Sequence, residues 1–76
     1  MNNIRRKELD KIRQELQILL ERLETVKDEE QESYGNMPES LQASEKGEKS
    51  ENAINNLEYA CDNISDAIER LEEATE

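Results

Sequence analysis

Few residues in this chain are of the types that commonly carry out catalysis. The sequence has no histidine, so the commonest general base and metal ligand are both missing. No imidazole is present to activate the serines, and neither a glycine-rich phosphate loop nor a CxxC pair occurs. We therefore expect that the chain is not an enzyme and that it uses no cofactor.

Cys61 is the only cysteine in the chain. A reactive thiol needs a cation nearby, whereas the closest charged residues in the sequence are Glu58, Asp62 and Asp66. Cys61 also falls at an apolar position of a heptad pattern, which predicts a small buried hydrophobic side chain. An interchain or reactive thiol is the alternative. One cysteine cannot form an internal disulfide, and this favours the cytoplasm.

Carboxylates are abundant but do not follow a metal-binding pattern. Asp28, Glu29, Glu30 and Glu32 lie close together, yet no calcium-loop spacing surrounds them. The Glu-x-x-His motif of di-iron helical bundles is also missing. The pattern predicts a solvated acidic face, and a ligand-binding or metal-binding helical bundle is the weakest hypothesis.

Length and charge limit the partners that we expect. The chain has 76 residues, of which 33% are hydrophobic and 39% charged, with a net charge of −10. This charge repels nucleic-acid phosphates and anionic lipids but suits a basic protein partner. No apolar run is long enough to span a membrane, and the first residues lack the apolar segment of a signal peptide. We expect a cytoplasmic protein that binds neither nucleic acid nor membrane.

Residues 1–34 are predicted to form the first amphipathic helix. Good helix formers dominate this stretch, and no proline occurs in it. Apolar residues recur at alternating steps of three and four, which is typical of a heptad seam. The predicted residues of the core and oligomer seam are Leu9, Ile12, Leu16, Leu19, Leu23 and Val26.

Residues 35–50 are predicted to be a turn or linker, and the part from Pro38 onward is either helical or a plain loop. Pro38 disfavours a helical conformation at Met37 and suits the first turn of a new helix. Extending the later apolar pattern backwards places small residues on the inner face: Ser40, Ala43, Gly47 and Ser50. Both a closely packed helix and a plain loop are compatible with that pattern.

Residues 51–76 are predicted to form the second amphipathic helix. Its seam residues are Ile54, Leu57, Cys61, Ile64, Ile68 and Leu71. A second stripe repeats every seven residues beside the seam and consists of Ala53, Ala60, Ala67 and Ala74. Alanine at these positions allows a neighbouring backbone to approach closely.

The charges favour an antiparallel arrangement of the two helices in one domain. Residues 1–27 contain seven basic and five acidic groups, whereas residues 52–76 contain one basic and seven acidic groups. The basic groups gather near the start of the first helix and the acidic groups near the end of the second, so each group opposes the dipole of its own helix. A hairpin places these oppositely charged ends side by side. The predicted fold class is all-α, a coiled-coil-like two-helix antiparallel hairpin.

One hairpin is expected to leave part of its apolar surface uncovered. Two helices bury their stripes on one side only, whereas two hairpins can enclose them in a four-helix bundle. We therefore expect a homo-oligomer, most simply a dimer. Residues that could contact a different partner are Met37, Pro38 and Leu41 in the linker and Tyr59 at an outward position. The alternative for Leu41 is that it closes the end of the core near Tyr34.

A family resemblance covers nearly the whole chain. A basic-to-acidic heptad helix is followed by the segments 36–42 (NMPESLQ) and 44–48 (SEKGE) and then by Ala-Ile-x-x-Leu-Glu-x-Ala repeats. This order resembles small uncharacterised acidic proteins of bacteriophages and prophages of Gram-positive bacteria. The resemblance implies a phage context and no catalytic residues. The leading hypothesis is a non-enzymatic protein-protein interaction module, an adaptor or inhibitor of a host protein. The alternative is an acidic nucleic-acid mimic that blocks a DNA-binding enzyme.

Overall fold

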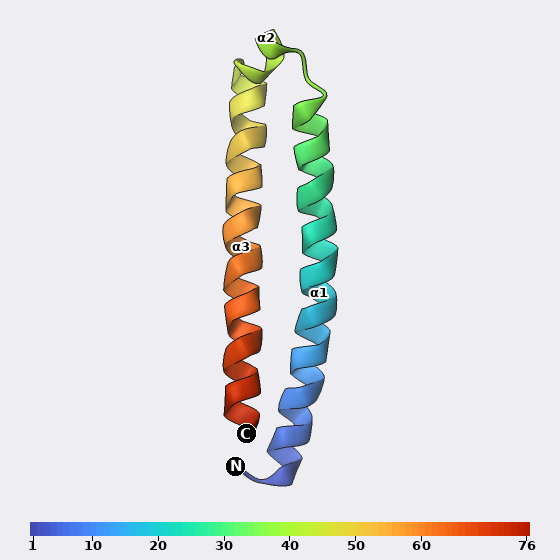
Figure 1. Cartoon of the computed structure of the whole chain (residues 1–76), viewed down its shortest axis with the longest axis vertical. Helices are drawn as coiled ribbons and strands as arrows, with labels where there is room; N and C mark the ends of the chain where they lie inside the picture. Colours follow the sequence, from blue (N-terminus) through green and yellow to red (C-terminus); the bar gives the residue numbers. More distant parts are fainter.

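The computed structural model describes every residue from Met1 to Glu76 and contains three α-helices and no strand. They are α1 (Asn3–Gly35), α2 (Glu39–Gln42) and α3 (Glu45–Thr75). Figure 1 shows α1 and α3 side by side and antiparallel, with α2 at the tip and both termini at the opposite end. The rod measures 58 × 14 × 13 Å. The predicted all-α class and the long helix pair are therefore confirmed.

Polar side chains fix where the two long helices begin. The Asn2 side-chain oxygen accepts a hydrogen bond of 2.9 Å from the Arg5 backbone N–H at the start of α1. The Ser44 hydroxyl accepts one of 3.4 Å from the Gly47 N–H at the start of α3. Side-chain oxygens at such N-caps satisfy backbone donors that have no partner within the helix.

The helix bounds differ from the predicted ones mainly in the linker. Helix α1 ends one residue later than predicted, whereas α3 begins at Glu45, six residues before the predicted start at 51. The segment 35–50 therefore consists of a turn, the short helix α2 and the first turns of α3. Gly47 and Ser50 lie buried on the inner face, while Ser40 and Ala43 are exposed.

The seam of α3 follows a heptad in which positions a and d face α1. Ile54, Cys61 and Ile68 occupy a positions and are buried. Leu57, Ile64 and Leu71 occupy d positions and are half-buried. All six residues of the predicted α3 stripe therefore lie between the helices.

The seam of α1 is shifted from the predicted stripe. Its a positions include Arg13, Leu20 and Lys27, of which Leu20 is the buried one, and its d positions include Leu16 and Leu23. The remaining d position in the predicted stripe, Leu9, is half-buried.

Three predicted α1 residues do not lie between the two helices, which corrects the sequence assignment for this contact. Ile12, Leu19 and Val26 are 37%, 48% and 51% exposed. The reason is that polar Arg13 and Lys27 occupy a positions of α1, so apolar periodicity follows the d positions and their outer neighbours instead.

The tip is closed by a contact that requires glycine. A Cβ atom on Gly47 would lie 2.6 Å from Gln42 Cα and closer still to the Gln42 carbonyl group. The Gln42 side chain in turn donates a hydrogen bond of 2.9 Å to the Tyr34 carbonyl at the end of α1. Gly47 thus allows the first turn of α3 to pass against α2.

Polar contacts between α1 and α3 are few. Ser50 Oγ donates a 2.6 Å hydrogen bond to Glu30 Oε1 near the tip. Near the open end, Arg13 Nη1 lies 3.8 Å from Glu72 Oε1, and this is the one ion pair that joins the two helices. The packing of apolar side chains, more than ion pairs, holds the hairpin together.

Candidate interaction surface

The two sides of the helix seam differ in chemistry. Around a heptad helix, position g adjoins d and position e adjoins a. Because α1 and α3 run in opposite directions, their g positions flank the seam on one side and their e positions on the other. We refer to these two sides as the apolar face and the acidic face.

The apolar face combines large side chains of α1 with small side chains of α3. Its g positions contain seven apolar residues and no acidic one: Ile12, Leu19 and Val26 in α1, and Ala53, Ala60, Ala67 and Ala74 in α3. Of the alanines, only Ala60 is half-buried, and the other three are exposed.

Burial across the seam is uneven in a way that matches this division. Every buried large apolar side chain, Leu20, Ile54, Cys61 and Ile68, is at an a position. The apolar d residues, which adjoin the apolar face, are only half-buried. They are Leu9, Leu16, Leu23, Leu57, Ile64 and Leu71. One side of the core is therefore left partly open to solvent.

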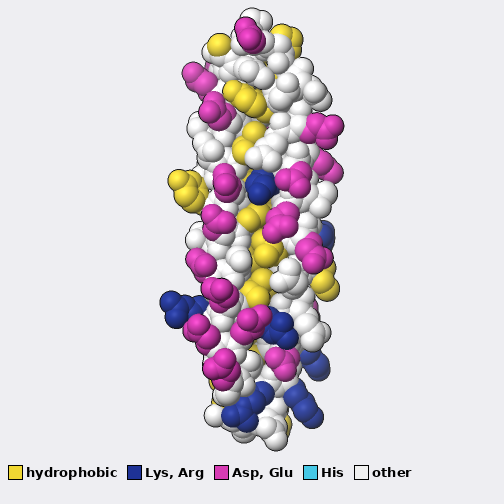
Figure 2. All heavy atoms as spheres, viewed as in Figure 1, with side chains coloured by type: hydrophobic (Ala, Val, Ile, Leu, Met, Phe, Trp, Pro, Cys, Tyr) yellow, Lys and Arg dark blue, Asp and Glu magenta, His cyan; other side chains and the backbone are white.

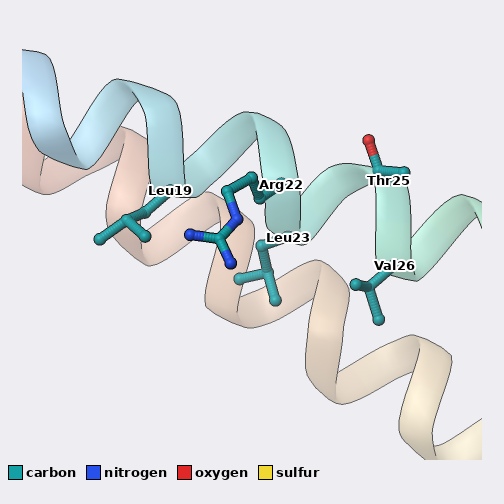
Figure 3. Close-up of a pocket in the computed structure, with 5 residues that line it drawn as sticks. All are labelled: Leu19, Arg22, Leu23, Thr25 and Val26. Atoms are coloured by element: carbon teal, nitrogen blue, oxygen red, sulfur yellow. The ribbon is translucent and has the colours of Figure 1, made fainter.

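An open groove of about 470 Å³ lies on α1 at this face. Its lining residues are Leu19, Arg22, Leu23, Thr25 and Val26. Figure 3 shows Leu19, Arg22, Leu23 and Val26 projecting from the same side of α1, with α3 passing behind them, whereas Thr25 points away. Three of the five lining side chains are apolar, and the groove is open to solvent, so that side chains of another molecule can reach it.

The acidic face presents carboxylates on both helices. Five of its eight e positions between residues 10 and 72 are acidic and none is basic: Asp10, Glu24, Glu51, Glu58 and Glu72 are the acidic ones. Figure 2 shows acidic side chains along both sides of a narrow apolar seam. This face is suited to contact with a basic surface.

Cys61 and the carboxylates form no reactive cluster. Cys61 is a free thiol and is 6% exposed within the core contact of Leu20 and Ile68. No group of three or more Asp, Glu, Cys or His side chains is arranged to hold a metal ion. In the acidic cluster at 28–32, Asp28, Glu29 and Glu32 are exposed, whereas Glu30 is half-buried and accepts the hydrogen bond from Ser50.

The predicted partner-contact residues are spread over two regions. Met37 and Leu41 are half-buried at the tip, while Pro38 is exposed. Tyr59 is 68% exposed on the outer side of α3. It lines a small polar depression together with Asn55, Glu58 and Asp62. The structure therefore does not bring Tyr59 and the tip residues into one site.

Sequence reasoning placed the large side chains of the apolar face in one combined core and oligomer seam, together with the residues that pack between α1 and α3. It also noted the alanine stripe without connecting it to Ile12, Leu19 and Val26. The connecting signal is that both sets repeat every seven residues immediately before an a position. That signal becomes visible once the seam of α1 is fixed through Leu20.

Comparisons with known protein families, curated proteins and solved structures give no match to this chain. None of the three helices combines the length and apolar character needed to cross a bilayer.

Proposed function

We propose that this chain is a non-enzymatic protein-protein interaction module that works as a pair of hairpins in a four-helix bundle. The apolar face is the observation that supports the proposal. It leaves a line of large side chains exposed beside half-buried core residues on an otherwise highly charged rod. Contiguous apolar surface of this kind is typical of an interaction site.

The occupant proposed for the apolar face is a second copy of the chain. Exposure of the d residues in one hairpin means that a second hairpin would complete the same core instead of adding a separate contact. In such a bundle the acidic faces of both hairpins point outward. They remain free to bind a basic host protein. The bundle would then act as an adaptor or inhibitor of that host protein, within a phage or prophage context.

Two neighbouring residues provide a matched test. Leu19 and Ile18 are 48% and 57% exposed, but Leu19 lies on the apolar face and Ile18 on the outer side of α1. We expect wild type and Ile18→Glu to scatter light as a dimer of twice 8.9 kDa. We expect Leu19→Glu to be monomeric at the same concentration, because it places a charge in the contact.

The result that would overturn the proposal is a mass of 8.9 kDa for wild type at micromolar concentration. Equal masses for the two variants would also contradict it, because the apolar face would then have no special role. Circular dichroism on each variant shows whether a lost dimer is accompanied by lost helix.

A second candidate function follows from the acidic face. Carboxylates on both sides of the seam extend along a rod that is 58 Å long. Such an array could occupy the basic groove of a DNA-binding enzyme in place of nucleic acid. Competition between this protein and duplex DNA for one such enzyme, lost on Glu51→Gln with Glu58→Gln, would support mimicry. Binding of the enzyme and DNA together would exclude it.

A further inference from the structure

The apolar face also specifies how a second copy would be oriented, an inference that rests on the proposed self-association. Two hairpins can meet face to face with their tips at the same end or at opposite ends. With tips together, α1 of one copy lies on α3 of the other. With tips apart, α1 lies on α1 and α3 lies on α3.

The contacts between α1 and α3 fix which residues lie at the same height along the rod. Arg13 contacts Glu72 near one end, and Glu30 contacts Ser50 near the other. When a residue of α1 and a residue of α3 lie at equal height, their two residue numbers therefore add up to between 80 and 85. By this register, Leu19 lies level with residues 61–66.

Each large residue of the apolar face is level with a gap between two alanines. Leu19 lies at a height between Ala60 and Ala67. By the same register, Ile12 is level with residues 68–73, between Ala67 and Ala74. Val26 is level with residues 54–59, between Ala53 and Ala60.

A two-fold rotation about the long axis of the bundle leaves every height unchanged. It would therefore place Leu19 of one copy between Ala60 and Ala67 of the second copy, with equivalent placements for Ile12 and Val26. A large side chain inserted between small ones on the facing helix is the packing that interdigitated helices require. With tips apart, the large residues would face one another and the alanines would face one another. The distance between the two α1 helices would then be larger than the distance between the two α3 helices.

The charges on the adjoining helices agree with the same orientation. Residues 5–13 of α1 hold five basic and two acidic groups, and residues 62–76, from α3 to the end of the chain, hold six acidic groups and one basic group. With tips together, these oppositely charged stretches of different copies are neighbours. With tips apart, the basic stretch would adjoin the acidic residues 28–32 of the other α1, but the acidic end of α3 would lose its basic neighbour and adjoin the near-neutral start of α3, residues 45–51. Both acidic ends of α3 have a basic neighbour in the other copy only when the tips are together.

We infer that two copies pair with their tips at the same end, with α1 of each copy antiparallel to α3 of the other, and with Ile12, Leu19 and Val26 inserted between the alanines of the second copy. This inference identifies the occupant of the groove beside Leu19 as the alanine stripe of a second copy.

Disulfide trapping between two different cysteine variants tests this orientation. Leu19→Cys and Ala67→Cys are prepared as separate samples, each checked for dimeric mass by light scattering, then mixed and oxidised mildly. We expect the mixture to give a cross-linked dimer several-fold more abundant than either variant gives alone. Wild type is the background control, because its Cys61 is buried. Ile18→Cys mixed with Ala67→Cys is the control for position.

Three other outcomes would contradict the inference, and each of them points to a different arrangement. If dimeric Leu19→Cys cross-links with itself as well as the mixture does, the tips lie at opposite ends. If the variants are dimeric and no sample cross-links above wild type, the second copy binds elsewhere. If wild type is monomeric, the proposed function fails first, and this inference fails with it.

Discussion

The apolar face and the acidic face are built from equivalent heptad positions of the same two helices, yet they have opposite chemistry. On the apolar side, seven g positions are apolar and none is acidic. On the acidic side, five e positions are acidic and none is basic. Burial of the apolar seam residues follows the same division. The apolar a residues Leu20, Ile54, Cys61 and Ile68 are buried beside the acidic face, whereas the apolar d residues are half-buried beside the apolar face.

One hairpin therefore encloses only one side of its core. Acidic residues beside the a positions can keep their charged groups in water while the a side chains pack between the helices. On the other side, alanines are too short to cover the d residues, and Ile12, Leu19 and Val26 extend the apolar surface outward. The uncovered side is therefore where we propose that association occurs.

The largest effect is expected from a charge placed on the closed side of the seam. Ile68 is 7% exposed and packs in the cluster with Leu20 and Cys61. Ile68→Asp buries a carboxylate with no partner and should cost more than about 4 kcal/mol, enough to unfold the chain. Circular dichroism should show loss of helix. Tyr59→Asp, on the exposed outer side of α3, is the control and should leave the helical signal unchanged.

Truncating one leucine on each side of the seam should show whether both sides are buried in solution. Leu20 at an a position is 7% exposed, whereas Leu23 at a d position is half-buried in the single chain. In a four-helix bundle both are buried, so Leu20→Ala and Leu23→Ala should each lower stability by roughly 2–5 kcal/mol. Urea denaturation measures both. A Leu23→Ala cost far below that of Leu20→Ala would indicate that the apolar face stays exposed in solution.

The tip should respond to a single methyl group on one of its two glycines. Gly47→Ala collides with the Gln42 backbone, and relieving the collision should cost roughly 1–3 kcal/mol. Gly35 has no atom within 4 Å of an added Cβ, so Gly35→Ala should be neutral or stabilising by up to about 1 kcal/mol. Thermal unfolding of the pair gives the comparison. Equal melting temperatures would contradict the close approach of α3 to α2.

The smallest effect is expected at the ion pair between the helices. Arg13 and Glu72 are 3.8 Å apart, with side chains 31% and 57% exposed. Glu72→Gln should therefore lower stability by no more than about 1 kcal/mol, and added salt should shrink the difference. Urea denaturation at low and high salt measures it. A loss of several kcal/mol would mean that charge pairing contributes more to the hairpin than apolar packing does.

The sequence predicted the two helices and the seam of α3 because every a and d position from Ile54 to Leu71 is apolar. The seam of α1 could not be assigned in the same way, since Arg13 and Lys27 occupy a positions. Apolar periodicity there follows d and g, which are the positions of the proposed oligomer contact. The early start of α3 was also obscured, because Gly47 and Ser50 pack through small size and not through hydrophobicity.

The thermal melting temperature of wild type, measured as a function of protein concentration, tests whether two hairpins share one core. If two hairpins complete one core, folding and association are linked, and mass action makes the melting temperature depend on concentration. We expect a rise of several degrees over a roughly hundredfold increase in concentration. A melting temperature that stays constant over that range would contradict the account, because a single hairpin would then be the complete folding unit.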